Sequence, residues 1–225
     1  MTQRLLNIHQ ASRVVKSGGS RISILNEIDF TASEGEFISL MGPSGSGKST
    51  LLNCIGMLDA FNHGHYTFLD QDVHKMNERN RSKLYREYIG FVFQAYHLID
   101  ELTIRENIET PLIYKKVKPS ERKAMVADML DRFNIVGKKD LFPEQLSGGQ
   151  QQLVGIARAL VANPKLILAD EPTGNLNSKQ SIEIMELFSE LNKEGVTIIQ
   201  ATHSEENASY GSRIVNLLDG RIITD

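Results

Sequence analysis

The nine residues Gly42-Pro-Ser-Gly-Ser-Gly-Lys-Ser-Thr50 restrict the fold of this chain more than any other stretch. They fit the pattern G-x-x-x-x-G-K-[S/T], in which glycines allow successive backbone N–H groups to converge on one anion. The apolar run Glu36–Met41 precedes the stretch, and Leu51, Leu52 and Ile55 follow it with helical spacing. This order of strand, loop and helix places a helix N-terminus beneath a bound phosphate. The stretch therefore predicts a nucleotide-binding loop.

Two side chains of this loop have specific predicted roles. Lys48 would neutralise the charge of the β- and γ-phosphates, and the Ser49 hydroxyl would be a ligand of Mg²⁺. The residues predicted to hold the nucleotide here are Gly42, Pro43, Ser44, Gly45, Ser46, Gly47, Lys48, Ser49 and Thr50.

The remaining apolar pattern predicts an α/β fold. The runs Ile89–Phe93, Leu166–Ala169 and Val196–Ala201 are apolar without polar alternation, which is typical of parallel strands buried on both faces. Helical patterns alternate with these strands, so we expect a mainly parallel core sheet. With 225 residues, 40% of them hydrophobic, the chain can form one large domain over 1–225 with a subdomain inserted in it.

Further segments complete the expected architecture. Residues 4–15 and Ile22–Phe30 predict an antiparallel pair of strands, the start of an antiparallel β subdomain. The block from about 95 to 160 is helical and interrupts the alternation of strands and helices, so we interpret it as an inserted helical subdomain. Arg213–Leu218 and Arg221–Thr224 predict a closing hairpin.

Some local details are also predicted from the pattern. A loop is expected over residues 61–65. Ser120, next to a proline, is expected to be the N-cap of a helix over 120–133. In the helix expected over Lys179–Lys193, Ile182 is among the apolar residues predicted to face the sheet.

Composition and charge exclude several kinds of partner. The formal net charge of −3 argues against a nucleic-acid interface, which needs an excess of Lys and Arg. The single cysteine, Cys54, excludes an intramolecular disulfide and favours a reducing cytosol. No run approaches the ~18–20 apolar residues that span a bilayer. A role at a membrane would therefore require another chain to supply the membrane part.

Two carboxylates directly follow a predicted buried strand. Asp170 and Glu171 come after Leu166–Ala169, at the strand end where open α/β sheets bind ligands. Asp170 is therefore the expected partner of Mg²⁺, and Glu171 can reach an attacking water as a general base. The alternative is an acidic turn before Pro172, but a pair at this position in a chain with a phosphate loop favours the catalytic interpretation.

Gln94 and His203 follow two other predicted strands at the same sheet edge. Gln94 is a neutral side chain able to contact both Mg²⁺ and the water, and His203 can donate to the γ-phosphate. Alone, each would more often be a hydrogen-bonded polar residue at a strand end. The predicted catalytic residues are thus Glu171, His203, Gln94 and Lys48, and the predicted metal ligands are Ser49, Gln94 and Asp170.

A second glycine-rich turn, Leu146-Ser-Gly-Gly-Gln150, opens an apolar helical pattern. No lysine follows it, so it is not a second phosphate loop, but its free N–H groups and the helix dipole still form an anion site. One nucleotide does not need two such sites in one subunit. We therefore expect a second copy of the chain to use this one, in a dimer with shared nucleotides.

Taken together, these motifs give the chain a resemblance to the ATP-binding subunit of ABC transporters over essentially all 225 residues. Gly90–Gln94, the triple glutamine 150–152 and Ala169–Leu176 are most similar to the branch that holds lipoprotein-releasing (LolD), macrolide- or peptide-exporting (MacB) and cell-division (FtsE) subunits. The matching motifs are Walker A at 42–50, the Q-loop at Gln94, the LSGGQ signature at 146–150, Walker B at 166–172, the D-loop at 175–177 and the switch histidine at His203.

The resemblance implies that two subunits close head to tail over two ATP–Mg²⁺. Ser147, Gly148 and Gly149 would contact the partner chain's γ-phosphate, and Gln150 belongs to the same nucleotide-binding turn. Gln94 and the helices after it would face an integral membrane permease. The chain would then be a peripheral subunit at the cytoplasmic face of the inner membrane, driving export of a lipoprotein, peptide or drug, or MacB-type mechanotransmission.

Four positions depart from the family pattern. Val15 stands, by spacing, where the family usually stacks an aromatic ring on adenine, so contact with the base is predicted to be weaker. Asn177 and Ser204 stand where aspartate is usual, and Leu153 stands where arginine often follows the glutamines. None of these changes removes a catalytic group, so we expect retained but slow ATPase activity from the subunit alone.

Two other classes of protein fit this sequence less well. A soluble ABC ATPase of translation carries two such domains with a linker, and one of DNA repair carries long coiled coils. This chain has one domain, no heptads and no basic excess. A phosphoryl-transferring kinase is disfavoured by LSGGQ and by Glu171, because a base placed for water hydrolyses ATP.

Overall fold

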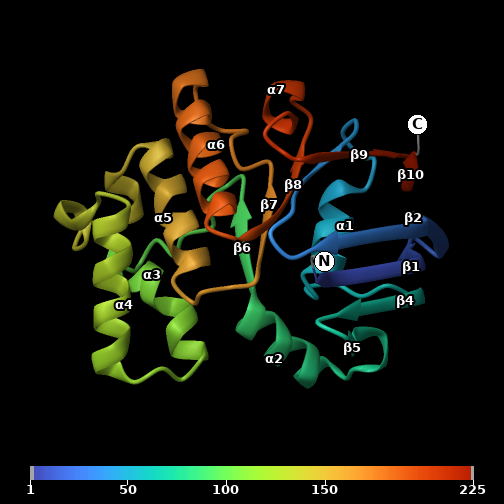
Figure 1. The fold of residues 1–225 in the computed structure, drawn as a ribbon, viewed down its shortest axis with the longest axis horizontal. Helices are drawn as coiled ribbons and strands as arrows, with labels where there is room; N and C mark the ends of the chain where they lie inside the picture. The colour runs from blue at the N-terminus through green and yellow to red at the C-terminus, as the bar shows by residue number, and fades with distance from the viewer. Residues whose placement is uncertain (1–2, 224–225) are drawn as a thin grey trace.

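The computed structural model describes residues 3–223 and contains, within them, a six-stranded core sheet in the order β10-β9-β3-β8-β7-β6 (Figure 1). Neighbouring strands are parallel except for the antiparallel pair of β9 and β10, which confirms the mainly parallel sheet and the closing hairpin. Thr224, expected in that hairpin, lies outside the described residues. The strands are β3 (Phe37–Met41), β6 (Ile89–Phe93), β7 (Leu166–Asp170), β8 (Thr197–Thr202), β9 (Arg213–Leu218) and β10 (Arg221–Ile223).

A second, antiparallel sheet has the order β2-β1-β4-β5. The long hairpin of β1 and β2 confirms the predicted antiparallel pair. The expected loop over 61–65 is wrong for its second half, because β4 already begins at His63. His63 and His65 pair with Ser12 and His9 of β1, so the hydrogen-bonding edge of β1 extends the strand beyond its apolar residues. The strands are β1 (Arg4–Ser17), β2 (Ser20–Ser33), β4 (His63–Phe68) and β5 (Gln71–Asp72).

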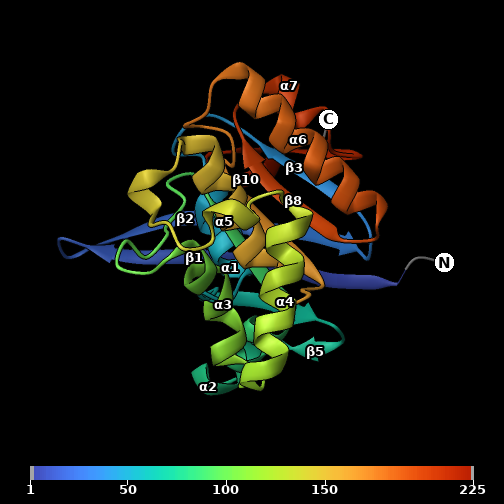
Figure 2. The same ribbon diagram turned by 90° about the vertical axis from the view of Figure 1, so that its left-hand side faces the viewer.

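The helices surround the core sheet, and α3, α4 and α5 gather at one side of it, as Figure 2 shows with that side toward the viewer. These three follow one another between β6 and β7. Within residues 3–223, no helix is both long enough and apolar enough to cross a bilayer. The helices are α1 (Lys48–Ile55), α2 (Glu78–Tyr88), α3 (Ile104–Tyr114), α4 (Pro119–Arg132), α5 (Gly148–Leu160), α6 (Ser178–Lys193) and α7 (Glu205–Ala208), with short 3₁₀ turns at Val73–Lys75, Val136–Lys138 and Pro143–Gln145.

Helix α4 starts earlier than predicted. Its N-cap is Lys118, and Pro119 is its first residue, so the expectation that Ser120 is the cap is wrong. Proline suits the first helical position because its fixed φ fits the helix and its missing N–H would have had no partner there. The proline, and not the serine after it, therefore marks the start.

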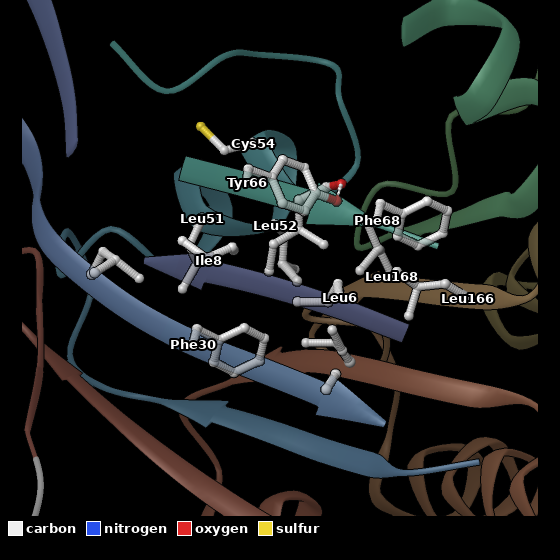
Figure 3. Close-up of a cluster of buried hydrophobic side chains, with 14 of the residues drawn as sticks. Leu6, Ile8, Phe30, Leu51, Leu52, Cys54, Tyr66, Phe68, Leu166 and Leu168 are labelled. Atoms are coloured by element: carbon white, nitrogen blue, oxygen red, sulfur yellow. Dashed lines mark hydrogen bonds between the residues drawn. The ribbon is translucent and has the colours of Figure 1, made fainter. Parts of the chain in front are cut away.

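The core sheet is buried on both faces at β3, β6, β7 and β8, whereas β9 and β10 carry exposed residues such as Ile214 and Ile223. Side chains alternate along each strand: Leu166 and Leu168 of β7 belong to one apolar cluster, and Ile167 and Ala169 belong to the other. The first cluster joins the core sheet to α1 and the antiparallel sheet, and Figure 3 shows ten of its side chains with labels. The second joins the opposite face to α3, α4, α5 and α6. This two-sided burial fixes α1, and with it the loop that precedes α1, against the sheet.

Helix α6 covers the second face with a stripe that contains Ile184, Met185, Phe188 and Leu191, all buried. Ile182 does not belong to this stripe, because the residue is 42% exposed. The prediction that Ile182 faces the sheet is therefore wrong. The helical spacing of apolar residues predicts a wider stripe than the part of α6 that the sheet buries.

We expect Phe188→Ala to lower the free energy of unfolding by about 3–5 kcal/mol, because it removes a fully buried ring and leaves a cavity. Chemical denaturation monitored by circular dichroism measures the change. Ile182→Ala on the same helix is the matched control and should change the stability by no more than about 0.5 kcal/mol. Equal losses in the two variants would contradict the orientation of α6 described above.

Candidate nucleotide-binding site

The glycine-rich loop between β3 and α1 depends on two backbone positions that glycine alone fits. Gly47, the N-cap of α1, has a left-handed φ of 106°. At Gly42, an added Cβ would collide with the backbone carbonyl of Leu217 in β9. The loop thus lies directly at the N-terminus of α1, where the unpaired N–H groups of a helix attract an anion.

The loop is tied to the C-terminal hairpin by backbone hydrogen bonds. The N–H of Gly220, in the turn between β9 and β10, donates to the carbonyl of Ser46 at 3.0 Å. The carbonyl of Gly220 in turn accepts from the N–H of Asn26 in β2 at 2.8 Å. The turn therefore connects the loop with the antiparallel sheet.

Lys48 is the buried cation of the site. Its side chain folds back over the loop, and Nζ donates to the carbonyls of Gly42 at 2.7 Å and Pro43 at 3.0 Å. These neutral acceptors hold the ammonium group where the predicted phosphates would lie. A phosphate would replace them with stronger, charge-assisted hydrogen bonds.

Ser49 and Asp170 meet across the edge of the sheet. The Ser49 hydroxyl, in the first turn of α1, donates to Asp170 Oδ1 at the end of β7 over 3.0 Å. Burial raises the pKa of the Asp170 carboxyl, whereas the Ser49 hydrogen bond and the Lys48 charge act to lower it. Two of the three predicted metal ligands are thus neighbours.

Glu171 and His203 form a hydrogen-bonded pair. His203 Nδ1 lies 2.9 Å from Glu171 Oε1. The Glu171 side chain is only 18% exposed, whereas the His203 ring is 71% exposed. Glu171 has a φ of 46°, unusual for a residue with a side chain, and its N–H donates to the carbonyl of Ala201 in β8. The backbone thus turns sharply at the residue predicted to act as the base.

Lys48, Ser49, Glu171 and His203 line one cavity of about 550 Å³, whereas Asp170 is not among its described lining residues. Sequence reasoning missed Ile24 of β2, an apolar residue that lines it and has no motif around it. Val15 is not among the lining residues in the described chain; it lies half-buried in β1, paired with Ile22. Its predicted contact with the base stays a prediction. The cavity is lined by Ile24, Ser44, Gly45, Gly47, Lys48, Ser49, Thr50, Gln94, Glu171 and His203.

A larger cavity of about 710 Å³ lies between the two sheets, at β1, β2, β9 and β10. Its ionisable lining residues already have polar partners: His9 lies 2.7 Å from Asp29, and Arg213 lies 2.7 Å from Glu36. The smaller cavity, in contrast, collects a phosphate loop, a buried lysine and a carboxylate–imidazole pair. We therefore assign the nucleotide to the smaller one.

Gln94 is held by a residue that sequence reasoning assigned only to the D-loop. Its Nε2 donates to Asn175 Oδ1 at 3.3 Å, and Asn175 Nδ2 donates to the Gln94 backbone carbonyl at 3.0 Å. The Gln94 side chain also lines the nucleotide cavity. The segment after β6 is therefore joined to the turn after β7.

The signature turn forms the N-terminus of α5. Ser147 is the N-cap, and its backbone N–H donates to the Gln150 side chain at 3.1 Å. Gly148 and Gly149 pack closely: an added Cβ would lie 2.7 Å from the Tyr96 hydroxyl and 2.6 Å from Gln180 Nε2, respectively. Among the described residues that line the nucleotide cavity, none belongs to 147–150. The structure thus separates the two predicted anion sites of the chain.

Arg158, which no motif singled out, links α5 to the segment after Gln94. Its guanidinium donates to the carbonyls of Tyr96 at 2.9 Å and of His97. Burial lowers the pKa of Arg158. Tyr96 and His97 both have left-handed φ values, 60° and 48°, so this strained segment is held by the helix that begins at the signature.

Two of the departures from the family pattern have a structural role. Asn177 is the N-cap of α6, where its side chain accepts from the N–H of Gln180 at 3.0 Å. Ser204 is the N-cap of α7 and accepts from the N–H of Asn207 at 3.3 Å. Asparagine and serine cap helices about as well as aspartate does. Leu153 is half-buried against the second apolar cluster.

The residues present fit a nucleotide with Mg²⁺. The hydroxyl of Ser46 is buried in the loop and, among residues 3–223, has no hydrogen-bond partner. The oxygen atoms of Ser49, Asp170 and Gln94 are the kind of ligand that Mg²⁺ prefers. A polar cradle of this kind matches a triphosphate and a hard cation better than an apolar ligand.

We expect Lys48→Ala to weaken binding of a fluorescent ATP analogue by about 10- to 100-fold, because hydrogen bonds to a charged group contribute about 1.5–3 kcal/mol. Fluorescence titration measures the affinity. The control Lys83→Ala removes the same charge from an exposed position on α2 and should leave the affinity unchanged. Equal affinities for both variants would contradict the assigned cavity.

Comparison with known proteins identifies the family. The ABC transporter family model matches residues 25–174. An uncharacterized ABC transporter ATP-binding protein of Bacillus subtilis, YvrO, is 45% identical over 98% of this chain and 96% of its own length. The macrolide export ATP-binding/permease protein MacB of Acinetobacter baylyi is 44% identical over 99% of this chain, which spans only 34% of MacB.

Solved structures agree with the observed fold. The dimeric ATP-binding cassette MJ0796, in a post-hydrolysis state bound to ADP and Pi, has a TM-score of 0.90 and 40% identity over 98% of this chain and 97% of that one. CbiO1 of Clostridium perfringens, part of the ABC transporter complex cbiONQ, has a TM-score of 0.86 and 29% identity over 99% and 88%. The α/β fold and the ATPase activity implied by the resemblance are thereby confirmed. The chain belongs to the ABC transporter family, as its ATP-binding, ATP-hydrolysing subunit.

Proposed function

We propose that two copies of this chain close head to tail over two ATP–Mg²⁺ and drive a separate membrane permease. One observation above all supports this: the signature turn of residues 147–150 lies outside the cavity formed by the phosphate loop, Gln94, Glu171 and His203. Ser147 is exposed at a helix N-terminus, ready to contact the γ-phosphate held by another copy. The related cassette MJ0796 is itself dimeric.

In each nucleotide site formed between the two copies, the residues of this chain have separate roles. Lys48 would leave the carbonyls of Gly42 and Pro43 for the β- and γ-phosphates. Ser49, Gln94 and Asp170 would hold Mg²⁺, which when bound neutralises the charge of the phosphate oxygens.

Glu171 is the general base of the proposed reaction. Its carboxylate would take a proton from the attacking water while the water oxygen forms a bond to the γ-phosphorus. The bond from that phosphorus to the β,γ-bridging oxygen would break at the same time, so that ADP leaves and inorganic phosphate forms. His203 fixes the orientation of this carboxylate through Nδ1, so Nε2 is the ring atom left to face the γ-phosphate. Hydrolysis would then weaken the contact between the copies and allow them to separate.

The permease is proposed to contact the segment after Gln94 and the helical block of about 95–160, which we keep as a subdomain. Ile99 and Phe142 are exposed there, 40% and 39%, although they are apolar. The backbone bond from Ile104 to Leu141 brings their two loops together. Exposed apolar residues in these two loops, one of them in the segment after Gln94, suit a membrane partner at the cytoplasmic face of the membrane.

The transported class is proposed from the relatives. The relative MacB is a macrolide export ATP-binding/permease protein, and this chain spans 34% of its length. Export of a lipoprotein, peptide or drug, or mechanotransmission without transport, is the function proposed here for the complex with the permease.

We expect Glu171→Gln to bind ATP–Mg²⁺, to dimerise and to lose turnover, because the amide keeps the shape of the carboxylate but cannot accept the proton. Light scattering after size exclusion measures the mass with and without ATP–Mg²⁺, and phosphate release measures turnover. A monomer at saturating ATP–Mg²⁺ would argue against the shared site.

A second substitution added to Glu171→Gln tests whether the signature turn lies in the dimer interface. Adding Ser147→Glu should keep nucleotide binding but prevent dimerisation, because a carboxylate would face the partner's γ-phosphate. Ser120→Glu places the same charge at the exposed start of α4 and should leave the dimer intact. Dimers from both variants would exclude the signature turn from the interface.

The permease proposal predicts that the tagged chain co-purifies from solubilised membranes with one integral membrane protein. Mass spectrometry identifies the partner. Replacing Ile99 and Phe142 together by serine should reduce its recovery while the ATP-dependent dimer remains. Recovery of the chain with ribosomes or DNA-repair factors, and with no membrane protein, would support the soluble alternative.

A further inference from the structure

The two hydrogen bonds between Gln94 and Asn175 define which end of the Gln94 amide faces the cavity. Asn175 Nδ2 donates to the Gln94 backbone carbonyl, and Gln94 Nε2 donates to Asn175 Oδ1. Both residues are exposed, so packing alone does not fix their orientation. The hydrogen bonds are the constraint.

The chemistry of the two amides leaves one arrangement. A backbone carbonyl can only accept, so Asn175 must present its NH₂ group to the Gln94 carbonyl. Asn175 therefore presents its oxygen to the Gln94 side chain. That oxygen can also only accept, so Gln94 must present Nε2 to it. The Gln94 backbone carbonyl thus determines the orientation of the Asn175 amide, and the Asn175 amide determines the orientation of the Gln94 amide.

The result leaves the Gln94 oxygen free. Among residues 3–223, Gln94 Oε1 has no hydrogen-bond donor, and the side chain lines the cavity with Ser49 and Glu171. Amide oxygen can be a ligand of Mg²⁺, whereas amide nitrogen cannot. The anchored nitrogen thus keeps the ligating atom turned away from Asn175.

The turn that carries Asn175 is itself well fixed. The N–H of Gly174 donates to the Glu171 carbonyl, and the N–H of Leu176 donates to the Thr173 carbonyl, each at 3.0 Å. A Cβ at Gly174 would lie 2.6 Å from Gln94 Nε2, so the turn packs directly against the Gln94 amide. Asn175 therefore presents its side chain from a rigid position.

We propose that Asn175 is a positioning residue for the metal site: it orients the Gln94 amide so that its oxygen, and not its nitrogen, faces Mg²⁺. Such outer partners of metal ligands commonly change metal affinity by 10- to 100-fold when they are removed. The inference rests on the proposed role of Gln94 as a metal ligand. It adds a residue outside the cavity to the determinants of Mg²⁺ binding.

The test uses the full chain with Glu171→Gln, which prevents turnover, and a fluorescent ATP analogue titrated with Mg²⁺. Asn175→Ala should raise the Mg²⁺ concentration for half-maximal binding of the analogue by about tenfold. Affinity for the analogue in EDTA should stay unchanged, because the hydrogen bonds of the Asn175 side chain within residues 3–223 go to Gln94 and not to the phosphate loop. Asn80→Ala, an exposed asparagine on α2, is the matched control and should change neither value.

A double-mutant cycle separates this role from a general effect on the fold. Gln94→Ala should also raise the Mg²⁺ midpoint, and Asn175→Ala should then add nothing, since it acts through the Gln94 amide. An unchanged midpoint in Asn175→Ala, an effect that persists without the Gln94 side chain, or weaker binding in EDTA would each overturn the proposal. The dimerisation test with Ser147→Glu does not depend on these outcomes, so the two proposals can fail separately.

Discussion

The site depends on the register of four parallel strands. Met41 of β3 pairs with Thr202 of β8, and Asp170 of β7 pairs with both Phe93 of β6 and Ala201 of β8. This register aligns the C-terminal ends of all four strands at one edge of the sheet. The phosphate loop, Gln94, Glu171 and His203 each follow directly, and Asp170 is the last residue of β7. A shift of the strand register by one residue would turn the side chains of that strand to the opposite face of the sheet. The packing of apolar side chains on both faces therefore also keeps the site residues in register.

Sequence reasoning identified most of this edge because its chemistry lies in short, local patterns. A glycine-rich loop, a carboxylate pair after an apolar run and a serine–glycine turn before a helix each have a meaning that does not require the rest of the chain. The parallel sheet could be predicted for the same reason, since strands such as Leu166–Ala169 carry no polar residue to face water.

What could not be predicted depends on tertiary contacts. Ile24 reaches the cavity only because β2 packs against the loop, with the Ile24 carbonyl and Leu25 close to Gly47. The width of the buried stripe on α6 depends on how much of the helix the sheet covers. For this reason the sequence pattern predicts that Ile182 faces the sheet, although the residue is exposed. The start of β4 at His63 required the edge of β1 as a partner. No local sequence pattern indicates any of these contacts.

The connection of the phosphate loop to the last hairpin has a consequence for how the chain is made. Gly220 supplies the N–H that satisfies Ser46, and Leu217 forms a wall beside Gly42. Both come from the end of the chain, whereas the loop belongs to its first quarter. Contacts of such long sequence separation slow folding, because the entropy of a long loop is lost before they can form. A growing chain would thus expose its nucleotide motif early on the ribosome but complete its binding site only after the final hairpin had emerged.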